Sequence, residues 1–264
     1  MLAQERQRKI LDLVSRHKSV PISKLAKELG VSPMTIRRDL TKLTEEGKLE
    51  RVYGGAISKL PVGYEPPYFT REGEDVHEKR QIAQLAASMI QEGDAVLLAT
   101  GTTVVEVARA INPALNLTVV TSSLPVAIEL VTKPQVKLIM AGGVLRREGL
   151  STIGHIAEFC FGEINADKLI TSAAGLSVEE GITEYSNEDA VIKRAMLDRA
   201  REVIVVSHHS KLERVAFASV APLDVVDVII TDSGVDSQLV ELYQERGIQI
   251  IIAPEKGNDE DATL

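Results

Sequence analysis

Small and hydroxylated residues follow several short apolar runs of the sequence, and these residue types suit the binding of an anion. The run at 95–99 leads into Thr100-Gly101-Thr102-Thr103, where glycine permits close approach and free amides at a helix start can donate hydrogen bonds. Similar residues end four later runs, and any one of them alone would be ordinary turn chemistry. Together they favour a phosphorylated small ligand. The candidate effector contacts are Thr100, Gly101, Thr102, Thr103, Ser122, Ser123, Gly142, Gly143, Arg147, Gly175, His208 and Lys211.

A second group of residues suits the reading of DNA. Ser32 and Pro33 mark a helix start, because serine is a good N-cap and proline at the first helical position needs no amide hydrogen bond. Ile36, Leu40 and Leu43 fall on one stripe of this helix and leave the opposite side exposed. Arginine can grip guanine bidentately, while lysine and hydroxyl groups hold phosphates. The candidate DNA contacts here are Ser32, Met34, Thr35, Arg37, Arg38, Thr41 and Lys42, with the two arginines as base readers.

The segment at 48–56 alternates and then turns as a β-hairpin does. Leu49, Arg51 and Tyr53 alternate before the turn Gly54-Gly55. A hairpin directly after a DNA-reading helix is the wing of a winged helix. We expect Arg51 and the backbone amides of Gly54 and Gly55 to reach phosphates or an adjacent minor groove, and Tyr53 to pack on the helix.

Two further helices are needed to position the DNA-reading helix. The patterns at 4–17 and 23–29 are amphipathic, Gly30 can end the second helix, and the short interval to Ser32 has helix-turn-helix spacing. Residues 1–60 carry 13 Lys and Arg against 7 Asp and Glu, whereas the remainder carries 17 against 31. A basic head therefore precedes an acidic body, although the net charge of −8 argues superficially against nucleic acid.

From residue 94 onwards, short apolar runs alternate with helical stretches. The runs at 95–99, 117–121, 136–140, 168–173, 203–207 and 228–231 are typical of strands buried on both faces. Helical patterns lie between most of them, as at 104–111, 124–132 and 188–200. This alternation predicts a mainly parallel sheet covered by helices, with its ligand site beyond the carboxyl ends of the strands.

Several motifs resemble the DeoR family of bacterial transcription repressors. They are TIRRDL at 35–40, GKLERVYGGA at 47–56, EPP at 65–67 and HEKRQIAQLAASMI at 77–90. The body from about 78 to 232 resembles the DeoR-type sensor domain, which is related to the fold of ribose-5-phosphate isomerase and glucosamine-6-phosphate deaminase. We therefore expect an α/β protein with a winged helix-turn-helix domain at 1–57 and a linker at 58–76. A mainly parallel, ribose-5-phosphate isomerase-like domain for effector sensing and oligomerisation follows at 77–253, and then a disordered tail at 254–264.

The resemblance also implies a function. Family members bind a phosphorylated sugar intermediate in the body, and this binding changes their affinity for the operator. We expect a cytoplasmic repressor of a carbohydrate operon that needs no cofactor. Its partners would be double-stranded operator DNA, a phosphorylated effector and further copies of itself in a dimer or tetramer. The residues that match the family pocket are Gly101, Thr102, Thr103, Ser122, Ser123, Gly142, Gly143, Gly175 and Lys211.

Two positions depart from the family pattern. Ala99 and His208 stand where the family often has aspartate. If neighbouring strands bring these positions together, the pocket has lost negative charge. An effector with an extra acidic group, such as a bisphosphate or a sugar-acid phosphate, would then be repelled less. Preference for a neutral-sugar monophosphate in a calorimetric screen would contradict this hypothesis.

An enzyme is the main alternative from another class, namely a sugar-phosphate isomerase or deaminase that carries a DNA-binding head. Its proton shuttle would be a carboxylate or an imidazole. Glu184, Glu188, Asp189 and His208 are candidates, but Ala99 removes the obvious carboxylate at the end of the first strand. We expect no catalytic residue.

Metal, single-stranded nucleic acid and membrane partners are not expected. The adjacent His208 and His209 should point to opposite sides of an extended segment, and no other cluster offers the remaining ligands. With no Trp and 3% aromatic residues, the chain lacks a stacking platform for single strands. No run approaches the ~20 apolar residues of a membrane span. The assembly surface should lie in the body, with 124–131 and 156–161 as candidate segments.

Overall fold

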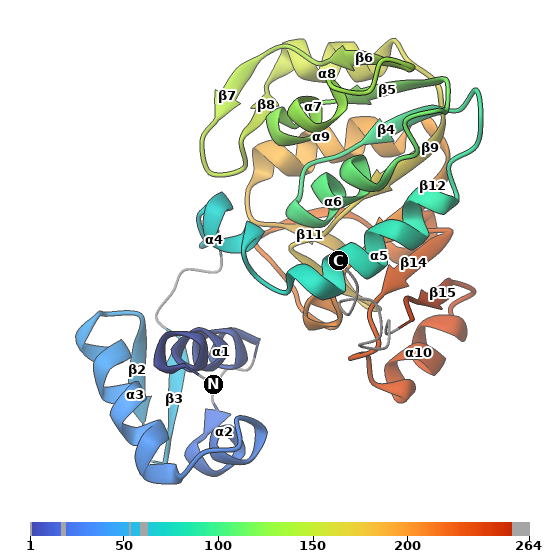
Figure 1. Ribbon diagram of the computed structural model, residues 1–264. Helices are drawn as coiled ribbons and strands as arrows, with labels where there is room; N and C mark the ends of the chain where they lie inside the picture. Colours follow the sequence, from blue (N-terminus) through green and yellow to red (C-terminus); the bar gives the residue numbers. More distant parts are fainter. Residues whose placement is uncertain (1, 17–19, 53, 59–62, 255–264) are drawn as a thin grey trace, which may run out of the picture. The chain divides into compact units, whose positions relative to one another are not determined.

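The fold is described from a computed structural model that covers residues 2–16, 20–52, 54–58 and 63–254. The chain divides into two compact units, Met1–Tyr64 and Glu65–Leu264 (Figure 1). Tyr53, predicted to pack on the DNA-reading helix, lies outside the described residues. So does the segment 255–264 of the predicted tail.

The first unit is a winged helix-turn-helix. Its helices are α1 (Ala3–Arg16), α2 (Ile22–Glu28) and α3 (Pro33–Glu45), and its strands are β1 (Val20–Pro21), β2 (Leu49–Val52) and β3 (Gly55–Ser58). The strands form an antiparallel sheet in the order β1-β3-β2. Ile10, Leu25, Ile36, Leu40 and Leu49 are buried where the helices meet the wing. The predicted apolar stripe of α3 thus anchors that helix and leaves its other side exposed.

A seven-stranded parallel sheet forms the centre of the second unit, in the order β15-β14-β12-β9-β4-β5-β6. Its strands are β4 (Ala95–Leu98), β5 (Leu117–Thr121), β6 (Val136–Met140), β9 (Ala166–Thr171), β12 (Ala200–Val206), β14 (Val228–Thr231) and β15 (Gln249–Ile252). Six of them coincide with predicted apolar runs, whereas β15 was not predicted. The expected fold class, a winged helix-turn-helix followed by a mainly parallel α/β domain, is confirmed.

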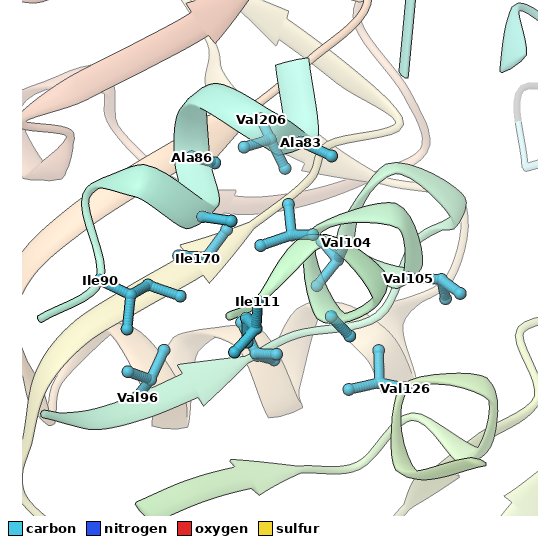
Figure 2. Close-up of a cluster of buried hydrophobic side chains, with 14 of the residues drawn as sticks. Ala83, Ala86, Ile90, Val96, Val104, Val105, Ile111, Val126, Ile170 and Val206 are labelled. Carbon is cyan, nitrogen blue, oxygen red and sulfur yellow. The ribbon is translucent and has the colours of Figure 1, made fainter. Parts of the chain in front are cut away.

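Helices cover both faces of this sheet. They are α5 (Val76–Ser88), α6 (Thr102–Ala110) and α7 (Leu124–Leu130) on one face, and α8 (His155–Gly162), α9 (Asn187–Leu197) and α10 (Ser237–Gln244) on the other. Figure 2 shows Ala83 and Val104 of the first set facing Val96, Ile170 and Val206 of the sheet. None of the described helices combines the length and hydrophobicity needed to cross a membrane.

Shorter antiparallel pieces extend the second unit. A hairpin joins β7 (Val144–Arg146) to β8 (Ser151–Ile153), and a small sheet has the order β10-β11-β13. The last three strands are Gly175–Ser177, Gly181–Glu184 and Ala218–Ala221, with short 3-10 turns η1 (His209–Lys211) and η2 (Leu223–Val225) nearby. The sequence did not predict these short strands, because they form neither a continuous apolar run nor a long alternation between turn residues.

The segment at 58–76 differs from the extended connection that its composition predicts. It contains the helix α4 (Tyr68–Glu72), and the compact second unit already begins at Glu65. Tyr68 is 5% exposed and packs into the main apolar cluster, while Arg71 forms an ion pair with Glu65. One buried aromatic ring and one shielded ion pair therefore fix a stretch that proline and glycine alone would leave extended.

Candidate DNA-binding and effector-binding sites

The start of α3 is fixed by its own side chains. Ser32 is the N-cap, and its Oγ accepts a hydrogen bond from the Thr35 backbone N at 3.2 Å. The hydroxyls of Ser32 and Thr35 are 2.9 Å apart. Both candidate DNA contacts thus hold the helix terminus, and the helix dipole there favours a phosphate.

The exposed side of α3 is basic. Arg37, Arg38 and Lys42 are exposed, and Met34 is 68% exposed. Within the described residues none of the three cations forms an ion pair within 4.0 Å, so their charges are available to a polyanion. The structure brings the helix candidates together on one surface, as the stripe of buried residues requires.

A buried ion pair behind this surface was not predicted. Asp39 is 4% exposed; Arg6 donates to it at 2.6 Å and Gln7 at 3.0 Å. Burial by itself would raise the pKa of Asp39, but the hydrogen bonds from Arg6 and Gln7 outweigh it and lower the pKa. Arg6 and Gln7 belong to α1, so the contact locks α1 to α3 and fixes how α3 presents its basic side.

Of the predicted wing contacts, Arg51 lies next to the exposed side of α3. Arg51 donates to the Thr41 hydroxyl at 3.1 Å, and this hydroxyl in turn donates to the Arg37 carbonyl at 2.9 Å. Gly54 is exposed at the turn with a φ of 80°. Gly55 is buried, and a Cβ there would lie 2.4 Å from the backbone oxygen of Val20 in β1. This close approach to β1 explains why position 55 is glycine, while the contact of its backbone amide with DNA stays a prediction.

Several effector candidates meet at one edge of the parallel sheet. The strands β5, β4, β9 and β12 are consecutive neighbours, so their carboxyl ends lie along the same edge. Gly101 follows β4 with a φ of 136°, and a Cβ there would lie 2.0 Å from Ser172 Oγ after β9. Ser172 donates to the Thr100 carbonyl at 2.9 Å. Glycine thus lets two strand ends touch, while Thr102 and Thr103 are buried in the first turn of α6.

The two serines after β5 have different surroundings. Ser123 is the N-cap of α7 and accepts a hydrogen bond from Val126 N at 3.4 Å. Ser122 is fully buried, and its hydroxyl has no hydrogen-bond partner among the described residues. A buried hydroxyl without a partner calls for an explanation. Because the side chain has no exposed surface, a ligand could reach this hydroxyl only after neighbouring groups move.

Two of the predicted glycines, Gly143 and Gly175, stand where a side chain would collide with a backbone oxygen. A Cβ on Gly143 would lie 2.4 Å from the backbone oxygen of Ile153, and one on Gly175 would lie 2.2 Å from that of Arg214. Gly142 is exposed, and its Cβ would make an ordinary 3.4 Å contact with Ile156. The β7–β8 hairpin and the small sheet require these close approaches, which explains Gly143 and Gly175 without a ligand.

The predicted effector contact Arg147 and its neighbour Arg146 have different surroundings. Arg147 is exposed, whereas the side chain of Arg146 is 11% exposed and forms ion pairs with Glu65 and Asp189. Burial alone would lower the pKa of Arg146, but both carboxylates outweigh it and raise the pKa. Burial raises the pKa of Glu65 despite the opposing effect of Arg71 and Arg146. This cluster ties the segment before α4 to the start of α9.

Further cations lie near these strand ends. Burial lowers the pKa of Lys79 to about 8, and the positive charge of Lys211 contributes to the same shift. Lys79 donates to the Arg71 carbonyl. Lys211 is half-buried, and among the described residues its ammonium group makes no hydrogen bond or ion pair. Lys79 is therefore a second lysine near these strand ends, beside the predicted Lys211. From sequence, Lys79 was visible only as part of the family-like motif at 77–90.

The histidine pair after β12 does not diverge as predicted. The rings of His208 and His209 have centroids 4.2 Å apart, and both approach Asp232 after β14. His208 is the N-cap of the 3-10 turn η1, so the extended backbone ends at His208 and the turn at His209 keeps the two rings close together. Burial lowers the pKa of His208, while hydrogen bonding to His209 overcomes burial and lowers the pKa of Asp232 to about 2.

The two family departures are not neighbours. Ala99 is fully buried in the apolar cluster beneath α8, and β9 separates β4 from β12. The condition that neighbouring strands bring Ala99 and His208 together is therefore not met, and the hypothesis of an extra acidic group loses its basis.

Two of the three candidate catalytic carboxylates form ion pairs. Glu184 is paired with Lys193 at 2.5 Å, and Lys193 also donates to the Ser172 carbonyl at 2.5 Å. Asp189 is held by Arg146 and accepts from Ser151 at 3.1 Å. Glu188 is exposed. These contacts suit a rigid binding edge better than a proton shuttle.

Comparisons with known proteins match both units. Residues 6–61 match the family model of the DeoR-like helix-turn-helix domain, and residues 74–233 match that of the DeoR C terminal sensor domain. The transcriptional regulator GlpR of Haloferax volcanii is 36% identical over 95% of this chain and 98% of its own. The transcriptional repressor GlcR of Bacillus subtilis is 34% identical over 98% of this chain and 100% of its own. Ribose 5-phosphate isomerase A from Methanocaldococcus jannaschii aligns with 51% of this chain and 53% of its own, at 17% identity and a TM-score of 0.37.

Proposed function

This chain belongs to the DeoR family of transcriptional regulators, and on that premise we propose that it is a sequence-specific repressor whose operator binding is controlled by a phosphorylated small molecule. The name of its relative GlcR, a transcriptional repressor, supports the negative sign of this control. The class of regulated genes that we propose is a carbohydrate operon.

One observation carries the proposal: α3 presents cations that form no ion pair within the described residues, on a helix whose opposite side packs into the head. Arg37 and Arg38 lie on the exposed side, while Asp39 between Arg38 and the core is fixed by Arg6. A helix held in this way can enter the major groove with a defined set of side chains. Lys42 and Arg51 extend the basic surface towards phosphates.

The test uses DNA duplexes selected from a random pool by the purified full-length chain. We expect Arg38→Ala to weaken binding to the selected duplex about 5- to 150-fold, the equivalent of ~1–3 kcal/mol for a lost base contact. Arg201→Ala is the matched control, because Arg201 is an exposed arginine of the body. Equal affinities of Arg38→Ala and the unchanged chain would remove Arg38 from the base readers.

The effector proposal rests on the carboxyl edge of the parallel sheet. The start of α6 offers backbone amides, Ser122 has a buried hydroxyl without a partner, and Lys211 offers an unpaired ammonium group within the described part of the chain. Together they match the needs of a phosphate attached to a hydroxylated carbon skeleton. We place the effector contacts at Thr100, Gly101, Thr102, Thr103, Ser122, Ser123, His208 and Lys211.

Thermal unfolding with a panel of sugar phosphates, the corresponding free sugars and inorganic phosphate tests this placement. We expect stabilisation by at least one sugar phosphate and none by its free sugar. Lys211→Ala should abolish the stabilisation, whereas Lys137→Ala, an exposed lysine of β6, should keep it. Loss in both variants, or stabilisation by free sugars alone, contradicts the proposal.

We further propose that the body assembles into a homo-oligomer through the end of the sheet that carries β6. Figure 1 shows α7, α8, β6 and β7 at the same end of the body. Large apolar side chains are exposed on or beside all four elements, namely Ile128, Val131, Met140, Val144, Leu145, Ile156 and Phe159. A surface of this kind on a protein with an exposed sheet edge is typical of an interface.

Light scattering during size-exclusion chromatography tests the assembly surface. Phe159 is 68% exposed, so Phe159→Asp should reduce the oligomer to a smaller species without unfolding it. Leu242→Asp on α10, beside the opposite end of the sheet, is the control and should leave the mass unchanged. An unchanged mass for Phe159→Asp would place the interface elsewhere.

A further inference from the structure

We propose that His208, His209 and Asp232 form a binding site for a divalent transition-metal ion. This site goes beyond the proposed function: it shares His208 with the proposed effector contacts, but neither DNA binding nor phosphate binding requires an ion there. Its ligands come from the ends of two adjacent strands, with the histidines after β12 and the aspartate after β14. Within the described residues, these three form the one group of His, Cys, Asp and Glu side chains close enough together to share an ion.

The distances fit a shared ion after small side-chain rotations. One ligand atom from each residue lies within 4.8 Å of the others. Metal bonds of about 2.0–2.2 Å place two ligand atoms roughly 3–4 Å apart. His208 Nε2 and Asp232 Oδ1 are already 3.9 Å apart. His209 Nδ1 and Asp232 Oδ2 are 2.5 Å apart in a hydrogen bond, so the ion would take the place of the shared proton.

The surrounding structure holds these ligands in position. Asp232 accepts hydrogen bonds from the His209 backbone N at 2.7 Å and from the Gly234 backbone N at 3.1 Å. A Cβ at Gly234 would lie 2.5 Å from the His209 ring, so glycine is what leaves room for that ring. His208 Nδ1 accepts a hydrogen bond from the Ser210 backbone N at 3.3 Å, so binding of an ion through Nε2 would move the ring proton to Nδ1, break that hydrogen bond and leave the N–H near Asp75 Oδ2, which is 3.8 Å away. A carboxylate behind a ligating histidine is a common feature of metal sites.

The donor set indicates which ions would bind. Two imidazoles and one carboxylate suit Zn²⁺, Fe²⁺, Co²⁺ and similar ions better than Mg²⁺ or Ca²⁺, which prefer oxygen ligands alone. Three protein ligands leave coordination positions open. These positions are available to water or to an oxygen of a small molecule bound at the carboxyl edge of the sheet, where Lys211 follows the histidine pair.

The experiment uses the full-length chain after treatment with a chelator. Co²⁺ is added while the visible absorption bands of the bound ion are recorded, and Zn²⁺ binding is measured by calorimetry. We expect one ion for each chain. His209→Ala, which removes a ring that is about one-third exposed, and Asp232→Asn should each weaken binding more than 10-fold. His155→Ala, an exposed histidine of α8, is the control and should bind as the unchanged chain does.

The variants distinguish this site from metal binding elsewhere on the chain. Absence of the Co²⁺ bands, or equal affinity in the chain with and without His209→Ala, would overturn the proposal. Equal weakening in His155→Ala would also overturn it, since the ion would then bind elsewhere. Circular dichroism shows whether each variant is folded, and His209→Ala serves where Asp232→Asn unfolds. Metal binding is measured without DNA or effector, so its failure is distinct from a failure of the proposed function.

Discussion

Replacing Arg146 with methionine tests whether the buried ion cluster holds the connecting segment onto the body. Arg146 joins Glu65 to Asp189, and the three side chains are 11%, 8% and 6% exposed. Methionine keeps much of the volume but leaves two buried carboxylates without their shared cation. Loss of one partner from a buried pair costs ~3–5 kcal/mol, which corresponds to a melting temperature of the body lower by roughly 6–20 °C. Arg71 still pairs with Glu65, which favours the lower end of this range.

The pH dependence of this variant gives a second readout. Burial already raises the pKa of Glu65, and removal of Arg146 should raise that pKa further. When the pKa of a carboxyl group is higher in the folded than in the unfolded state, the protein loses stability as the pH rises from the unfolded pKa through the folded pKa. The deficit of Arg146→Met should therefore be smaller near pH 5 than near pH 7.5.

Differential scanning calorimetry of the full-length chain at both pH values measures this effect. The double variant Arg146→Met with Glu65→Gln should recover part of the lost stability, because the neutral amide removes one unpaired charge. A melting temperature within about 2 °C of the unchanged chain would refute the reasoning. So would a deficit that is the same at both pH values and is not relieved by Glu65→Gln.

The other predictions concern the head and the strand ends. Gly55→Ala should destabilise the head by ~1–3 kcal/mol in urea unfolding, since its Cβ would lie 2.4 Å from the Val20 backbone oxygen. Gly101→Ala should remove most of the effector-induced rise in melting temperature, because its Cβ would displace Ser172 and its φ is 136°. Asp39→Asn should lower the stability of the head at pH 7 by ~1.5–3 kcal/mol. The pKa of Asp39 is lowered in the folded state, so this difference should disappear as the pH falls below ~4 and through the lowered pKa.

Glycines in open surroundings supply the controls. Gly54→Ala and Gly93→Ala also have positive φ values, but nothing lies within 4 Å of a Cβ at either position. Each should cost only the backbone strain of about 1–2 kcal/mol. If Gly93→Ala weakens the effector response as much as Gly101→Ala does, the close contact at Ser172 is not the cause. For Asp39→Asn, a difference from the unchanged chain that persists far below the pKa of Asp39 would contradict the expected charge effect.

Local patterns were sufficient to predict the regular elements. The N-cap Ser32, the proline after it and the four-and-three spacing of Ile36, Leu40 and Leu43 act within one or two helical turns, so they identify α3 from sequence. The six strands were predicted for the same reason, since apolar runs between turn residues mark strands buried on both faces. By contrast, α4 depends on a single buried ring, that of Tyr68, which no periodic pattern announces.

The site was harder to predict because its contacts join distant parts of the chain. Gly143 and Gly175 have the composition of a ligand-binding turn, but the backbone oxygen that requires each glycine lies on another element. Adjacent Arg146 and Arg147 are equivalent in type, and only the fold determines which of them is buried. The approach of Asp232 to His209 spans 23 positions. Residue types and spacing thus predicted that the candidate residues lie at the carboxyl edge of the sheet. The contact partners of each residue could be identified only from the structure.

The ion pairs of Glu65 also limit how far the head can travel from the body. Arg71 and Arg146 fix Glu65 at the start of the second unit, and Ser58 ends the last strand of the first. Between these two points the chain has only residues 59–64, and an extended chain spans at most ~3.3–3.6 Å per residue. The tether therefore reaches no more than roughly 25 Å, less than one turn of DNA at ~34–36 Å. In an oligomer, the distance between the Glu65 positions would limit which operator spacings the heads can reach. Added residues in the tether would widen that range of spacings.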